Sequence, residues 1–229
     1  MLIKIITMVF VAVFAICLIV PAKLISSEKV KKYVNGILTS VILFVVITNI
    51  VYKTWFNSFD LKYDLPLNLC DLSLVWILLT LLSKHQYFFE LSYFWGVGGA
   101  IHALLTPDLI SLEINFPVVL FLLNHGIVIA AALYLCLGLN MKPNRWSWLR
   151  VPAFTQLYLI VVGLVNLILN SNYSYLGHKP QHPSVMDYFG PWPIYIIWLE
   201  VFGLLTMGLL FIPFWMSRWI KKIEDSKDL

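Results

Sequence analysis

The sequence predicts an all-α membrane protein: one domain, residues 1–229, built as a bundle of seven transmembrane helices. Of its 229 residues, 60% are hydrophobic and only 12% are charged, with a mean hydropathy of +0.84. A soluble chain carries about 25% charged residues. The hydrophobic residues form seven runs, and we expect each to be long enough to cross a hydrocarbon core of about 30 Å, which needs roughly 20 apolar residues. We expect helices because the alternating pattern of membrane β-strands is absent.

The seven expected helices follow one another through short connections. We place them near residues 2–20, 34–56, 67–82, 88–105, 116–139, 149–170 and 192–219. The first run could also be read as a signal peptide, since Lys4 precedes it and Val20-Pro21-Ala22 resembles a cleavage site. Its apolar stretch is longer than a typical signal-peptide core of about 7–15 residues, so we interpret it as a helix.

The basic residues predict the orientation of the bundle. With the N-terminus outside, twelve of the sixteen lysines and arginines fall in inner segments and four in outer ones. The positive-inside rule therefore predicts an outer N-terminus and a cytoplasmic C-terminus in the cell membrane. The net charge of +4 requires no nucleic-acid partner, because basic inner loops beside anionic lipid account for it.

A compact polar motif, LPLNLCD at residues 65–71, opens the third expected helix on the outer side. Pro66 suits a first helical turn, and Asn68, Cys70 and Asp71 follow it closely. A helix N-terminus favours the thiolate form of a cysteine, although the neighbouring carboxylate opposes this. Free cysteines are often inert packing residues, as we expect for the other two, Cys17 and Cys136.

Two histidines lie on neighbouring expected helices. His125 follows Asn124 in the motif LNHG, about nine residues or roughly 13 Å into the fifth helix. Ionisable groups at such a depth face the bundle interior or a wet cavity and usually serve a function. His102, in the fourth helix, lies nearer the outer boundary. A substrate-positioning role there competes with simple solvation at the interface.

The last two expected helices add further polar groups. Glu200 lies about 12 Å inside the seventh helix, which starts near Tyr195, and we expect a histidine, tyrosine or amide partner for it. Asn166 and Asn170 share a face of the sixth helix and are expected to join helices by hydrogen bonds. The loop at 171–191, rich in Pro, Tyr, His and Asn, is predicted to be ordered or functional.

These groups all fall in the outer halves of their helices, which predicts a polar pocket that opens outward within an apolar wall. Such a pocket suits an amphiphile whose tails remain in lipid. Cysteine and histidine form the minimal nucleophile and base pair for acyl transfer. The candidate site residues are Asn68, Cys70, Asp71, His102, Asn124, His125, Asn166, Asn170, Tyr195 and Glu200.

The motifs resemble those of the YwaF-type bacterial integral membrane proteins, which are similar to animal transmembrane protein 164. They are LPLNLCD, YFWGVGGAIHALLTPDL, FP with LNHG, and NYSYLG with GPWPIY. The resemblance implies an acyltransferase that moves fatty acyl chains between phospholipids through an acyl-cysteine. It also implies a distant similarity to androgen-induced-gene lipid hydrolases, which use threonine and histidine. It maps the nucleophile onto Cys70 and the base onto His125.

The leading hypothesis is therefore a lipid acyltransferase or lipid hydrolase that acts on a membrane phospholipid or lysophospholipid without a cofactor. Asn68, Asn124 or Tyr195 would supply oxyanion donors. One alternative is a metal-dependent hydrolase in which His102, His125 and a carboxylate of Asp71 or Glu200 bind zinc, although no HExxH motif is present. The other is a non-enzymatic transporter, lipid carrier or sensor that uses the same pocket.

Overall fold

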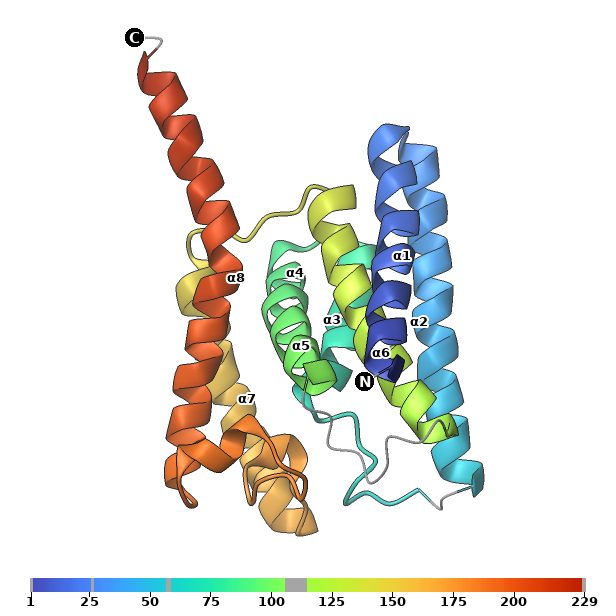
Figure 1. Ribbon diagram of the computed structural model, residues 1–229, viewed down its shortest axis with the longest axis vertical. Coiled ribbons are helices and arrows are strands. Elements are labelled where there is room, and N and C mark those ends of the chain that lie inside the picture. Colours follow the sequence, from blue (N-terminus) through green and yellow to red (C-terminus); the bar gives the residue numbers. More distant parts are fainter. Residues whose placement is uncertain (1, 26, 57–58, 106–114, 228–229) are drawn as a thin grey trace.

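The computed structural model describes residues 2–25, 27–56, 59–105 and 115–227, and these contain helices and connections with no β-strand (Figure 1). The expected all-α class is confirmed, and a helical segment lies at each of the seven predicted positions. The helical elements in chain order are α1 (Leu2–Leu24), α2 (Glu28–Phe56), α3 (Leu69–Ser83), α4 (Gln86–Leu91), the π-helix η1 (Ser92–Val97), α5 (Gly98–Leu105), α6 (Phe116–Leu133), the π-helix η2 (Tyr134–Gly138), α7 (Ser147–Leu169), the 3₁₀ turns η3 (Tyr173–Tyr175) and η4 (Val185–Phe189), and α8 (Ile194–Lys227).

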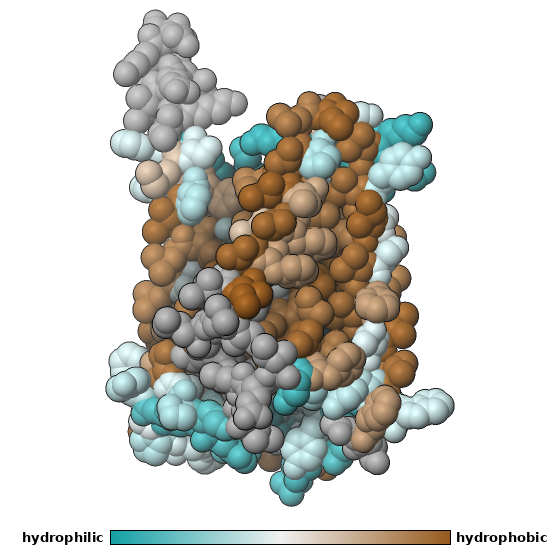
Figure 2. Space-filling view, turned by 45° about the vertical axis from the view of Figure 1, so that its right-hand side comes forward, coloured by the Kyte–Doolittle hydropathy of each residue, from teal (hydrophilic) through white to brown (hydrophobic). Residues whose placement is uncertain are grey.

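Four of the described segments are long and apolar enough to cross a membrane. They are Glu28–Phe56, Phe116–Gly138, Ser147–Leu169 and Ile194–Trp219. The apolar parts of α1 and α3 are shorter, and the 15 residues of α3 extend only about 22 Å. The seven membrane crossings and the orientation of the termini therefore stay predictions. Figure 2 shows a broad apolar belt between two polar rims, as a membrane protein requires.

Several predicted boundaries are wrong: α8 continues to Lys227 and not to residue 219, α1 continues to Leu24 and not to residue 20, and the starts of α2 and α3 also differ. Helix α2 begins six residues early at Glu28, whose carboxylate pairs with Lys31 at 2.8 Å and supports an additional turn. Helix α3 begins at Leu69 and not at Leu67, so Pro66 lies before the helix and outside its first turn. The Leu67 N–H instead donates to the Leu65 carbonyl at 2.8 Å, which is incompatible with a helix start there.

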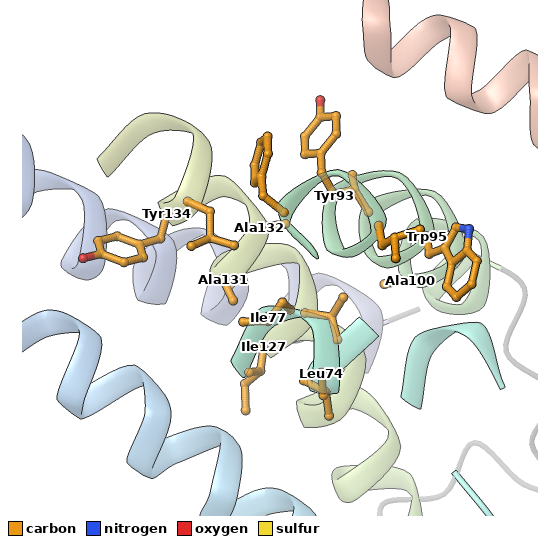
Figure 3. Close-up of a cluster of buried hydrophobic side chains, with 14 of the residues drawn as sticks. Leu74, Ile77, Tyr93, Trp95, Ala100, Ile127, Ala131, Ala132 and Tyr134 are labelled. Carbon is orange, nitrogen blue, oxygen red and sulfur yellow. The ribbon is translucent and has the colours of Figure 1, made fainter. Parts of the chain in front are cut away.

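Helix α6 is the central helix of the bundle. In the apolar stretch of the segment Phe116–Gly138, 72% of the residues are buried, against 11% in the apolar stretch of α8. Helix α6 contacts α1, α2, α3 and α5. The core around it is a continuous cluster of side chains that includes Leu74, Ile77 and Ile127 (Figure 3). Small residues allow close helix approach: a Cβ on Gly126 would lie 2.6 Å from Val11 Cγ2 of α1. The helix that carries His125 is thus fixed from several sides.

Helices α7 and α8 lie at the periphery of the bundle (Figure 1). Their attachment uses hydrogen bonds as well as packing. The Trp95 indole donates to Thr155 of α7 at 2.9 Å, and the Tyr93 hydroxyl donates to the Leu210 carbonyl of α8 at 3.1 Å. Most of their remaining surface is apolar and exposed, which suits contact with lipid.

The two cysteines predicted to be packing residues differ in their surroundings. Cys136 is buried in η2, as predicted. Cys17 is exposed, so that prediction is wrong. The reason is that α1 buries the stripe formed by Val11, Ala15 and Leu18, and Cys17 lies outside it.

A buried ion pair joins α4 to α7 at the end of the bundle opposite the start of α3. The fully buried Glu90 carboxylate accepts two hydrogen bonds from Arg150, at 2.9 and 2.8 Å. It also accepts from the Gln86 amide at 2.8 Å and from the Asn144 backbone N–H at 3.1 Å. A buried carboxylate with these four contacts holds α4, α7 and the preceding loop together.

We expect Arg150→Met to destabilise the fold by about 3 kcal/mol, because it leaves Glu90 buried without its cation. This value is at the low end for a buried pair since the Arg150 side chain is 40% exposed. Adding Glu90→Gln should restore part of the loss by removing the buried charge. Denaturation in detergent measures each variant, with Lys31→Met at the exposed Glu28 pair as the control. Equal effects of Arg150→Met and Lys31→Met would contradict the assignment.

Candidate functional site

Three helices approach closely around Cys70, the second residue of α3. Its Sγ packs against Gly99 of α5, where an added Cβ would lie only 3.0 Å from the sulfur. In η1, which precedes α5, a Cβ on Gly96 would lie 2.8 Å from Val128 Cγ1 of α6 and 3.4 Å from Ser73 Cβ of α3. The absence of a side chain at both glycines thus favours this close approach, in agreement with helix packing through small residues in membranes.

This three-helix contact places Cys70 and His125 at the same level of the bundle. Cys70 lies three residues before Ser73 in α3, and His125 lies three residues before Val128 in α6. Gly99 lies three residues after Gly96. Each of these steps leads toward the end of the bundle where α3 and α6 begin. Three residues are close to one helical turn, so the same three helix faces continue toward that end. The thiol and the imidazole thus belong to helices that contact one another at the level of both groups.

Asp71 links the two motifs directly. Its Oδ2 accepts from the Asn68 amide at 3.2 Å, and its Oδ1 accepts from the Asn124 amide of α6 at 3.4 Å. LPLNLCD and LNHG are therefore joined by hydrogen bonds of Asp71, while the predicted outward-opening pocket stays a prediction.

His125 is buried and held in one orientation. Its Nδ1 lies 2.8 Å from the Phe121 carbonyl, and the two rings are 4.2 Å apart between centroids. A carbonyl can only accept, so Nδ1 carries a hydrogen, and in the neutral imidazole Nε2 then keeps the lone pair. This neutral tautomer is the form that a general base needs.

Asn166 and Asn170 close the end of α7 and do not join two helices, so their predicted role is wrong. The Asn166 side-chain oxygen accepts from Tyr173 N–H and from the Ser171 hydroxyl, both at 2.8 Å, and its amide donates to the Tyr173 carbonyl at 2.9 Å. Asn170 is the left-handed C-cap of α7 with φ 51°, a conformation that asparagine tolerates. Both residues therefore define the path of the following loop.

That loop is fastened to the segment before α3. The Tyr173 hydroxyl donates to the Leu61 carbonyl at 2.7 Å and accepts from the Leu65 N–H at 2.9 Å. The Ser174 N–H donates to the Asn68 side chain at 3.1 Å. NYSYLG is thus joined to LPLNLCD, and the prediction that this loop is ordered is confirmed.

Sequence reasoning missed Tyr158 and Tyr173 as parts of this arrangement. Tyr158 of α7 is buried, and its hydroxyl donates to the Leu67 carbonyl at 2.6 Å and contacts the Ser174 hydroxyl. A single tyrosine in an apolar helix carries no signal of such a contact. Tyr173 lies in one of the quoted motifs, but the partners of its hydroxyl, Leu61 and Leu65, lie more than 100 residues away.

Tyr195 anchors the loop from its other side. Its buried hydroxyl donates to the Tyr175 carbonyl, and Lys179 Nζ lies 5.7 Å from its ring centroid. The hydroxyl proton is therefore committed to the loop, which argues against Tyr195 as an oxyanion donor. His178 and His182 lie in non-helical chain on either side of Pro180.

His102 and Glu200 contact other elements than Cys70 does. The His102 Nε2 lies 3.2 Å from the Thr206 hydroxyl and its ring packs on Phe202, so it faces α8. Glu200 accepts from the Gln156 amide of α7 at 3.2 Å, which confirms an amide partner from a neighbouring helix. Within the described ranges, no three His, Cys, Asp or Glu side chains are grouped to hold a metal ion, so the zinc alternative gains no ligand set.

Comparison with known proteins agrees with the motif resemblance. The model of the TMEM164 family matches residues 1–211. An uncharacterized protein of Treponema pallidum (strain Nichols) is 26% identical over 178 residues, which cover 77% of this chain and 73% of that protein. No solved structure matches the chain. The match to the family confirms the resemblance that the motifs predicted.

We expect Asp71→Ala to lower stability by about 1–3 kcal/mol, because the Asn68 and Asn124 amides lose their acceptor. If the bond to Asn124 forms as described, Asp71→Ala and Asn124→Ala will be coupled by about 0.5 kcal/mol or more in a double-mutant cycle. Denaturation in detergent measures the cycle. Asn35→Ala, which removes an amide of α2 bonded to Tyr134, is the control and should be additive with Asp71→Ala. Additivity in both cycles would rule out the bridge.

Proposed function

The chain belongs to the TMEM164 family, and we propose that it is a membrane enzyme that transfers or hydrolyses a phospholipid acyl chain through an acyl-cysteine at Cys70. One observation carries the proposal: Cys70 and His125 lie on contacting helices joined by the Asp71–Asn124 hydrogen bond. A nucleophile, a base and an orienting polar group at one level are the minimal set for this chemistry.

The reaction begins with deprotonation of the Cys70 thiol by His125 Nε2. The sulfur attacks the carbonyl carbon of the phospholipid ester, a C–S bond forms, and the carbon–oxygen ester bond breaks. The lysophospholipid leaves as an alcohol with the proton from the imidazolium. The products of this half-reaction are the thioester on Cys70 and neutral His125.

The second half-reaction releases the acyl chain. A lysophospholipid hydroxyl, or water, gives its proton to His125 and attacks the thioester carbonyl. The C–S bond breaks and the sulfur regains the proton as a thiol. The acceptor decides the outcome: a hydroxyl gives acyl transfer, whereas water gives hydrolysis to a fatty acid.

Two kinds of N–H group support stabilisation of the oxyanion in both steps: the first backbone N–H groups of α3 and the side-chain amide of Asn124. The first backbone N–H groups of α3 have no intrahelical acceptor and lie beside the thiol. The Asn68 side chain does not cap them, and its oxygen accepts from the Ser174 N–H. The Asn124 amide has a second hydrogen beyond the one given to Asp71.

The membrane supplies the substrate in this proposal. The site lies at the end of the bundle where α3 and α6 begin, and this end faces outward if the positive-inside prediction holds. A phospholipid head group can remain among the polar residues of the loop while its acyl chains stay beside the apolar helices. The proposed location is therefore the outer leaflet of the cell membrane.

We expect Cys70→Ala to abolish acyl turnover, and His125→Gln to reduce it by about 10²–10⁴-fold by removing the base. Purified protein in vesicles receives a phospholipid with a labelled acyl chain and an unlabelled lysophospholipid. Mass spectrometry measures acylated lipid, fatty acid and the thioester on Cys70. Cys136→Ala serves as the matched control, because this buried cysteine belongs to η2. Full turnover in Cys70→Ala would exclude the acyl-cysteine mechanism.

A further inference from the structure

Tyr158 contacts the chain immediately before the proposed nucleophile. Its hydroxyl donates to the Leu67 carbonyl at 2.6 Å, three residues before Cys70. Its ring packs on Trp95 with centroids 5.0 Å apart, and the side chain is buried. Tyr158 therefore lies in a rigid aromatic setting that fixes the place of its hydroxyl.

The same hydroxyl also contacts Ser174 of the loop after α7. Ser174 has a φ of 56°, a left-handed conformation that is strained for a residue other than glycine, and its N–H donates to the Asn68 side chain at 3.1 Å. Leu67 and Asn68 are thus both held from outside α3. Strained backbone persists only where surrounding contacts fix it, as they do here.

The position of the sulfur depends on these two residues. Helix α3 starts at Leu69 without a side-chain cap, so its first turn takes its direction from Leu67 and Asn68. The sulfur has little room, because Gly99 packs so closely that an added Cβ would lie 3.0 Å from it. A shift of the helix start would therefore move the sulfur relative to α5 and α6.

We propose that Tyr158 is a positioning residue for Cys70: its hydroxyl fixes the Leu67 carbonyl and thereby the direction in which the sulfur meets substrate. Its role in acyl transfer rests on the function proposed above. The placement of the thiol is a separate property and is measurable without turnover. A displaced nucleophile loses rate more than substrate affinity.

We test this with Tyr158→Phe, which keeps the ring and removes the hydroxyl. In a Cys17→Ser, Cys136→Ser background, the alkylation of Cys70 by N-ethylmaleimide is followed across pH, and acyl transfer is followed in vesicles. The expected result is an altered pH profile of alkylation and a kcat about tenfold or more lower, with KM within about twofold of the parent.

Tyr134→Phe is the matched control, since it removes another buried hydroxyl that donates a hydrogen bond, to Asn35 at 2.7 Å. It should leave alkylation and kcat unchanged. Equal losses in both variants would mark a general structural effect and overturn the proposal. If Tyr158→Phe does not fold, Ser174→Ala removes the hydroxyl that Tyr158 contacts and is expected to change the same two measurements.

The outcomes separate this inference from the proposed function. If the parent protein transfers no acyl chain, the proposed function fails, and the alkylation profiles still decide the role of Tyr158. If the parent is active and Tyr158→Phe keeps its kcat and alkylation profile, the positioning role is overturned while the acyl-cysteine mechanism stands.

Discussion

The close approach of α3, α5 and α6 is the constraint on which the candidate site depends. Lipid gives little hydrophobic drive for one apolar helix to bind another, so small residues and hydrogen bonds must bring helices together. Gly96 and Gly99 allow the contacts with α6 and with the Cys70 sulfur. The Asp71–Asn124 bond then forms between helices that are already adjacent. A larger residue at either glycine would press on Val128 or on the Cys70 sulfur, so these side chains would have to shift.

The peripheral helices are held at both ends as well as by hydrogen bonds along their length, such as those of Thr155 in α7 and Leu210 in α8. Around the candidate site, Asn166 and Tyr173 tie the end of α7 to the loop and to the segment before α3. At the opposite end, Glu90 and Arg150 join α7 to α4, and the Arg218 guanidinium of α8 donates to the Pro143 carbonyl. The exposed apolar surface of both helices remains available for lipid.

Hydropathy predicted the positions of the helices because every spanning backbone must satisfy its own hydrogen bonds. It failed where partners distant in sequence decide the structure. The start of α3 moved to Leu69 because the chain before it is bound by loop residues more than 100 positions away. The sequence did not indicate a role for Glu90, because its partner Arg150 lies 60 residues away. Cys70 and His125 were found because each lies in a compact motif, whereas Tyr158 stands alone in an apolar run.

The candidate site differs in one respect from a catalytic triad. In a triad, a carboxylate accepts from the histidine Nδ1 and fixes its tautomer. Here the Phe121 carbonyl of the same helix accepts from Nδ1, so the tautomer of His125 is set by α6 itself. Asp71 is then available to bind the Asn68 and Asn124 amides. The carboxylate therefore aligns the two motifs, while the helix backbone orients the base.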